Sequence, residues 1–263
     1  MSNPFRALLR RRPPTVPTVA HWQRIEHALP FLAWGPPGHT QALRERAMQF
    51  LAQKEFSGAG ALTLTDDMLL AIALQAALPV LHLGVEAYRG WVGVIVYPGE
   101  ICIPREEMDE YGVVHEYTDI VCGEAREDGP VLLGWEEDGF DPEINVIVHE
   151  FAHKLDMTDG IANGCPPLPA QISRARWARV FAAAFDDFQH RCDAIEDADD
   201  ERAWDALPLD PYAAEHPAEF FAVASEAFFI DPHRLRSAYP EVYHLLGAFY
   251  QQNPAAYAPA PCC

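Results

Sequence analysis

The first part of the chain carries apolar residues at helical spacing. Trp22, Ile25 and Leu29 recur every three or four residues, and a second apolar series follows the Gly35–His39 stretch. Because glycine and proline interrupt helices, this pattern predicts two helices between about residues 18 and 56.

A third helix is predicted after Thr65. This residue precedes two aspartates and the apolar run 68–77, which is the pattern of a capped and buried helix. The following residues, Pro79 to Leu83, are compatible with a short extended segment.

The middle of the chain changes to a strand pattern. Residues 91–103 are rich in β-branched and aromatic side chains on both sides of Pro98-Gly99, and residues 112–122 and 131–135 are similar. After Asp141 the helical pattern returns almost to the end, with interruptions near 160–172, 193–211 and 231. Helices, a small sheet and helices again indicate a mostly helical α+β fold, with the sheet preceding the last helical part.

The domain organisation follows from composition. Residues 1–17 are rich in arginine and proline, so we expect a flexible arm there. Residues 18–263 contain no repeat and no long linker, which predicts a single domain.

The net charge of −20, from 19 basic and 39 acidic residues, excludes a nucleic-acid backbone as a direct partner. Residues 106–143 hold 14 acidic and one basic side chain, and residues 186–205 hold nine and two. If these segments flank an active site, their field would attract cations; the simpler interpretation is that they are solvated acidic loops.

Two further features concern the compartment. None of the six cysteines forms a CxxC pair, and the basic residues near the N-terminus follow the short apolar stretch instead of preceding it. No apolar run approaches the roughly 18 residues of a membrane span. These features predict a cytoplasmic protein with reduced thiols and no membrane partner.

The strongest chemical signal is the HExxH motif from His149 to His153. Histidines four residues apart on a helix lie on one face, one turn apart, and can bind one zinc ion together. Glu150, between them in sequence, can act as general base on a metal-bound water. Asp141-Pro142 is a good helix start and Gly160 a good stop. The competing interpretation is a pair of helix histidines satisfied by ordinary hydrogen bonds.

The residues alone leave the third metal ligand open. Asp159 would complete a local HExxHxxDxxD arrangement, although Asp156 replaces the glycine that such a turn uses. Asp156 itself is better suited to accept a hydrogen bond from a ligand histidine. Glu219 and Glu226 are carboxylates in a heavily apolar helix predicted to start at Pro217, where unpaired charges are expensive. Glu219 is also compatible with an ordinary first-turn carboxylate that favours the helix dipole.

Two sequence blocks together resemble the Mlc titration factor A family. They are His149-Glu-Phe-Ala-His-Lys-Leu-Asp and the segment from Asp210-Pro-Tyr through Pro217-Ala-Glu-Phe-Phe-Ala-Val-Ala-Ser-Glu. The family consists of cytoplasmic zinc peptidases whose core resembles the catalytic domain of anthrax lethal factor. The resemblance implies a zincin-type, gluzincin-like metallopeptidase with one zinc ion per chain.

The same resemblance implies the roles of the site residues. His149, His153 and Glu219 would bind zinc, and Glu150 would be the catalytic base. Tyr212 would place a hydroxyl near the zinc, where it can hydrogen-bond the developing oxyanion. From its position after Pro211 alone, Tyr212 would be taken for a loop aromatic.

The resemblance also implies aminopeptidase activity on peptides or amino-acid derivatives, and binding of the sugar-uptake repressor Mlc. The alternative hypothesis is a protein that chiefly sequesters a transcription factor, with the N-terminal arm and the aromatic helix around Tyr239–Tyr250 as contact surface. The simpler interpretation of these two segments is a frayed terminus and a core helix. A structural zinc site is a third option, but it gives Glu150 no role.

Overall fold

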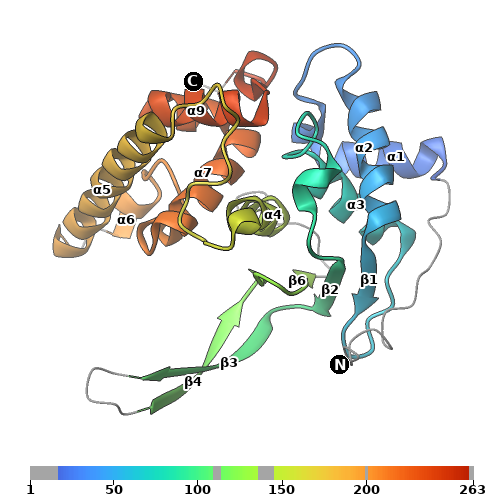
Figure 1. Cartoon of the computed structure of the whole chain (residues 1–263), viewed down its shortest axis with the longest axis horizontal. Coiled ribbons are helices and arrows are strands. Elements are labelled where there is room, and N and C mark those ends of the chain that lie inside the picture. The colour runs from blue at the N-terminus through green and yellow to red at the C-terminus, as the bar shows by residue number, and fades with distance from the viewer. Residues whose placement is uncertain (1–16, 109–113, 136–144, 199–200, 261–263) are drawn as a thin grey trace.

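The computed structural model describes residues 17–108, 114–135, 145–198 and 201–260. Figure 1 shows helix α4 (Val146–Asp156) near the middle of the molecule, between two groups of helices and beside a small sheet. The predicted α+β architecture, mostly helical with a sheet before the HExxH helix, is confirmed. The expected arm and the helix start at Asp141 lie outside the described residues.

The first helical group lies in the N-terminal part of the chain, with strand β1 (Glu55–Gly58) between its second and third helices. It contains α1 (Val19–Ala28), α2 (His39–Gln53), α3 (Asp66–Ala77) and the 3₁₀ turns η2 (Pro30–Ala33) and η3 (Val85–Tyr88). The Thr65 side chain accepts a hydrogen bond from the Met68 N–H, so the predicted cap of α3 is confirmed. The extended segment expected over Pro79–Leu83 is wrong, because Gly84 N–H donates to the Val80 carbonyl and closes a turn there.

The sheet is small and mixed. Its strand order is β1-β2-β6-β5, with β1 (Glu55–Gly58), β2 (Gly93–Pro98) and β6 (Val131–Trp135) parallel. Strand β5 (Gly123–Ala125) runs antiparallel to β6 at the edge. The sequence pattern does not predict strands β1 and β5. Strands are recognised from runs of four to eight residues, and β1 has only four residues and β5 only three.

A separate antiparallel pair projects from the body of the molecule (Figure 1). Strands β3 (Ile101–Met108) and β4 (Val114–Val121) pair along their whole length. The two strands predicted on either side of Pro98-Gly99 are therefore confirmed, but they belong to different sheets. Val94 and Val96 of β2 are fully buried in the parallel sheet, while β3 leaves it to pair with β4.

The second helical group follows α4. Its elements are η4 (Met157–Asp159), α5 (Arg174–Ala198), α6 (Glu201–Trp204), η5 (Pro211–Ala214), α7 (Pro217–Ile230), α8 (Pro232–Ala238), α9 (Pro240–Tyr250) and η6 (Pro254–Ala256). Gly160 ends η4 in the left-handed conformation, with φ 87°. The break expected from residue 193 begins later, because α5 continues to Ala198.

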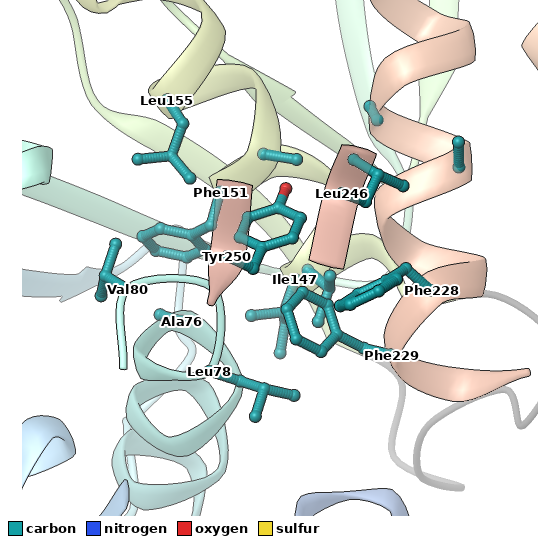
Figure 2. Packing of buried hydrophobic residues seen from close by; sticks show 14 of the residues in the cluster. Ala76, Leu78, Val80, Ile147, Phe151, Leu155, Phe228, Phe229, Leu246 and Tyr250 are labelled. Atoms are coloured by element: carbon teal, nitrogen blue, oxygen red, sulfur yellow. The ribbon is translucent and has the colours of Figure 1, made fainter. Parts of the chain in front are cut away.

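Helix α4 is buried on all sides, which is typical of a helix in the middle of a core. In Figure 2 its residues Ile147 and Phe151 pack between Leu78 and Val80 after α3 and the aromatic rings of α7 and α9. Phe151 is fully buried and contacts three further aromatic rings, those of Phe50, Tyr88 and Trp91.

The aromatic side chains of the Tyr239–Tyr250 segment belong to this core. Tyr239, Tyr243 and Tyr250 are all buried, so the segment is a core helix and its tyrosines do not form an exposed contact surface. No helix in the described ranges has both the length and the apolar character that crossing a membrane requires.

Candidate metal centre

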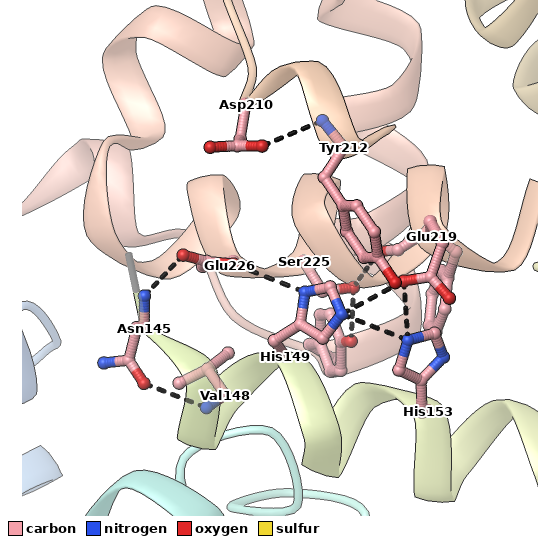
Figure 3. Close-up of polar contacts among 11 residues, drawn as sticks. Asn145, Val148, His149, His153, Asp210, Tyr212, Glu219, Ser225 and Glu226 are labelled. Atoms are coloured by element: carbon pink, nitrogen blue, oxygen red, sulfur yellow. Dashed lines mark hydrogen bonds and ion pairs between the residues drawn. The ribbon is translucent and has the colours of Figure 1, made fainter. Parts of the chain in front are cut away.

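Helices α4 and α7 bring three ligand atoms together. The Nε2 atoms of His149 and His153 lie 3.1 and 3.0 Å from Oε2 of Glu219 and 3.1 Å from each other (Figure 3). Around a tetrahedral ion with bonds of about 2.0–2.1 Å, ligand atoms stand about 3.3–3.4 Å apart. The three atoms therefore fit the first coordination shell of one metal ion. Within the described residues, they form the one group of His, Cys, Asp or Glu ligand atoms close enough to share an ion.

Local sequence fixes where both helices begin. The Asn145 side chain caps α4 by accepting a hydrogen bond from the Val148 N–H at 2.9 Å. The His216 ring caps α7 by accepting from the Ala218 N–H at 3.2 Å, and Pro217 follows at the first helical position. Because α7 starts there, Glu219 lies in its first turn, at the level of the two histidines.

Glu226 lies seven residues after Glu219 in α7 and contacts the other ring nitrogen of His149, Nδ1. Its Oε2 is 3.5 Å from His149 Nδ1, and its Oε1 accepts a hydrogen bond from the Asn145 N–H at 2.5 Å. The Asn145 side chain in turn donates to Gln75 of α3 at 2.6 Å. In this geometry Glu226 orients a ligand imidazole and does not join the group of three atoms.

The local alternative ligand, Asp159, and the expected hydrogen-bond acceptor for a ligand histidine, Asp156, both lie outside the group of three atoms. Asp159 is exposed on η4 and is outside the group of three. Asp156 is fully buried and its Oδ2 accepts a hydrogen bond from the Gly164 N–H at 2.7 Å. Burial raises the Asp156 pKa to about 6. Its Oδ1 and the Nδ1 of His153 are both buried without a hydrogen-bond partner in the described structure.

Glu150 points toward strand β5 at the edge of the sheet. Its side chain is buried, and its carboxylate accepts a hydrogen bond from the Ala125 N–H. A Cβ at position 123 would lie 2.7 Å from Cγ and Oε1 of Glu150, so only glycine fits there. Burial raises the Glu150 pKa, while the nearby His149 and His153 oppose that rise. A raised carboxyl pKa suits a group that must accept and return a proton.

Tyr212 reaches the same place from η5. Its backbone N–H donates to Asp210 at 2.8 Å, its ring centroid lies 6.0 Å from that of His149, and Figure 3 shows its hydroxyl directed toward Glu219 and the imidazoles. Burial and then the charges of Glu219 and Glu215 raise its pKa, so the phenol keeps its proton and can donate a hydrogen bond.

His149 and Glu219 stabilise each other's charged forms. Burial lowers the pKa of His149, but hydrogen bonds with Glu219 and Glu226 outweigh it and raise the pKa. Burial raises the pKa of Glu219, but the two histidines lower it to about 2. Because a metal binds neutral imidazole, metal binding displaces a proton that Glu219 otherwise holds on His149.

The structure thus brings together all five residues singled out from the sequence: His149, Glu150, His153, Tyr212 and Glu219. Sequence reasoning missed Asn145, Ala125 and Gly123. An Asn directly before a helix is a recognisable cap signal, but Asp141-Pro142 is a competing start signal a few residues earlier in the chain. The contacts of Ala125 and Gly123 with Glu150 depend on sheet pairing and carry no local signal.

A groove of about 690 Å³ lies beside the metal centre, between α5, α6 and η5. Tyr212 lines it together with four carboxylates, those of Asp186, Asp193, Glu196 and Glu215. Part of the second acidic segment therefore lies next to a residue of the site. Of the first acidic segment, residues 109–113 and 136–143 lie outside the described residues.

The different positions of Glu219 and Glu226 predict different metal-binding losses. Glu219→Ala removes a ligand atom and should leave little metal bound after gel filtration. Glu226→Gln keeps an oxygen for the Asn145 N–H but weakens the orientation of His149, so metal affinity should fall about 10- to 100-fold. Chelator competition followed by elemental analysis measures both, with Asp159→Asn as the matched control that should bind metal normally. Normal metal content in Glu219→Ala would contradict the arrangement.

Comparisons with known proteins identify a metallopeptidase family. A model of the glucose-regulated metallo-peptidase M90 family matches residues 6–251. The chain is 39% identical over 247 residues to Mlc titration factor A of Pectobacterium atrosepticum, covering 92% of this chain and 90% of the relative. It is 37% identical to the protein of that name from Serratia proteamaculans, over 92% of this chain and 91% of the relative. It is 36% identical to the protein of that name from Yersinia pestis, over 95% of this chain and 90% of the relative. The resemblance drawn from the two sequence blocks is confirmed, and the chain belongs to the glucose-regulated metallopeptidase family M90.

Proposed function

We propose that the protein is a cytoplasmic zinc-dependent aminopeptidase that hydrolyses peptide bonds at the HExxH centre. The observation that carries the proposal is the convergence of His149, His153 and Glu219 within 3.0–3.1 Å. The Tyr212 ring lies 6.0 Å from the His149 ring, and the Glu150 carboxyl is close enough to both histidines for them to lower its pKa. Two imidazoles and one carboxylate are a ligand set that zinc takes in hydrolytic enzymes, with one position left for water or substrate.

When bound, the zinc ion would polarise the scissile carbonyl and lower the pKa of a coordinated water to about 7. Glu150 would take the proton from the attacking water and deliver it to the leaving amine, which its raised pKa favours. The Tyr212 hydroxyl would donate a hydrogen bond to the oxyanion that develops on the carbonyl. Glu226 would hold His149 in the tautomer that keeps Nε2 directed at the metal.

The first prediction separates chemistry from metal binding. Glu150→Gln removes the base but no ligand, so hydrolysis of amino-acid p-nitroanilides should fall at least about 1,000-fold while zinc content stays near one ion per chain. Zinc and activity are measured on the same preparation, and a chelator should abolish the activity of the unchanged protein. Full activity in Glu150→Gln with metal retained would refute the role of Glu150.

The acidic groove predicts a preference for positively charged substrates. Four carboxylates beside Tyr212 would attract a free α-amino group and a lysine side chain, and salt would screen this attraction. The kcat/KM for lysine p-nitroanilide should therefore fall with ionic strength more steeply than that for the leucine compound. N-acetylated leucine p-nitroanilide should be hydrolysed poorly. Equal salt dependence for the lysine and leucine substrates would show that the carboxylates are only a solvated surface.

A second function is suggested by the name of the relatives, Mlc titration factor A. We propose that the chain also binds a transcriptional repressor of the Mlc type, if its host has one, with peptidase activity as the separate or secondary property. A pull-down with purified repressor should capture Glu219→Ala and the unchanged chain equally if binding does not need the metal. Loss of capture in Glu219→Ala, with folding intact by circular dichroism, would show that the two functions share the site.

A further inference from the structure

The lysine that follows the HExxH motif is almost entirely buried. Lys154 is 3% exposed, and its ammonium donates hydrogen bonds to the carbonyls of Arg126 at 2.5 Å, Glu127 at 3.1 Å and Gly129 at 3.4 Å. These carbonyls belong to the turn that joins β5 to β6. A buried ammonium is expensive unless hydrogen-bonded, and here three backbone carbonyls meet that need.

A second buried lysine shares the same aromatic ring but has other anchors. The ammonium of Lys154 lies 5.0 Å from the Trp91 ring centroid and that of Lys54 lies 3.6 Å from it. Lys54 is 7% exposed and donates to the carbonyls of Tyr88 and Trp91 at 2.6 and 2.7 Å. It therefore stabilises the chain before β2, whereas Lys154 alone of the two contacts the turn after β5.

The β5 end of that turn is also the part of the chain that contacts Glu150. Ala125, directly before Arg126, donates its N–H to the Glu150 carboxylate, and Gly123 packs against the Glu150 side chain. Glu150 and Lys154 are four residues apart on α4, so they lie on the same face, one turn apart. Helix α4 thus makes two contacts with this part of the chain, one helical turn apart. The Glu150 carboxylate contacts Ala125 of β5, and the Lys154 ammonium contacts the turn that follows β5.

We propose that Lys154 is a positioning residue for the reaction: it fixes the β5–β6 turn against α4 and thereby sets where β5 holds Glu150. The inference rests on the proposed role of Glu150. Lys154 touches neither the metal ligands' converging atoms nor the base itself, so its loss should affect the catalytic step and leave metal binding intact.

The test compares Lys154→Met with Lys54→Met. Lys154→Met should lower kcat about 10- to 100-fold, the range expected when a catalytic group moves by about 1 Å, with zinc content unchanged and KM changed much less. Lys154→Arg, which can still donate to the turn carbonyls, should recover much of the kcat. Lys54→Met should lower the denaturation midpoint while kcat stays near that of the unchanged protein.

A second variant tests the contact between β5 and Glu150 without removing a buried charge. Ala125→Pro deletes the N–H that Glu150 accepts, at an edge strand where proline is tolerated. It should lower kcat with zinc retained, and the double variant Lys154→Met with Ala125→Pro should be no slower than the slower single variant. If Lys154→Met does not fold, Lys154→Gln, which keeps one amide donor for the turn carbonyls, replaces it in both comparisons and should show the same loss of kcat with zinc retained.

Three outcomes would overturn the inference: wild-type kcat in Lys154→Met, zinc loss in proportion to activity loss, or multiplied effects in the double variant. The proposed function fails separately, if Glu150→Gln remains active. An inactive Glu150→Gln beside a fully active Lys154→Met removes the role of Lys154 alone.

Discussion

The metal centre depends on the contact between α4 and α7, where charged side chains are buried in an apolar environment. Glu226 is 7% exposed. Glu219 lies in the first turn of α7, a helix whose other side chains are mostly phenylalanine and alanine. Carboxylates in such a place are costly unless they are paired. His149 and His153 supply the pairing, and Glu219 holds the ligand set together through the same contacts that a metal would use.

The rest of the fold restricts how this contact can vary. Asn145 links α4 to α3 through Gln75 and to α7 through Glu226, so the start of the HExxH helix is fixed from two sides. Further along, Phe151 is enclosed by aromatic rings from the first helical group. Ligands on rigid helices with supporting polar contacts keep their geometry better than ligands on loops. Glu150 and the Tyr212 phenol belong to α4 itself and to η5.

The residues of the site are easier to predict from the sequence than the strands of the sheet and their order. The i, i+4 spacing of His149 and His153 is a local property of one helix, so it could be read directly. The residues alone do not decide between Glu219, Glu226 and Asp159 as third ligand, because spacing cannot show which carboxylate reaches the histidines in the folded chain. The helix start explains the outcome: Pro217 sets the register of α7, which places Glu219 at the level of both Nε2 atoms and Glu226 at His149 Nδ1. Strand β5 escaped prediction because three residues carry no periodicity, although they position Glu150.

X-ray absorption at the zinc edge of the purified protein tests the central claim most directly, since it reports the ligand types without reference to activity. The account predicts two imidazoles and additional oxygen ligands at about 2.0–2.1 Å, with a total of four, and no sulfur shell near about 2.3 Å. A sulfur contribution, or four protein nitrogens around the ion, would contradict a centre built from His149, His153 and Glu219.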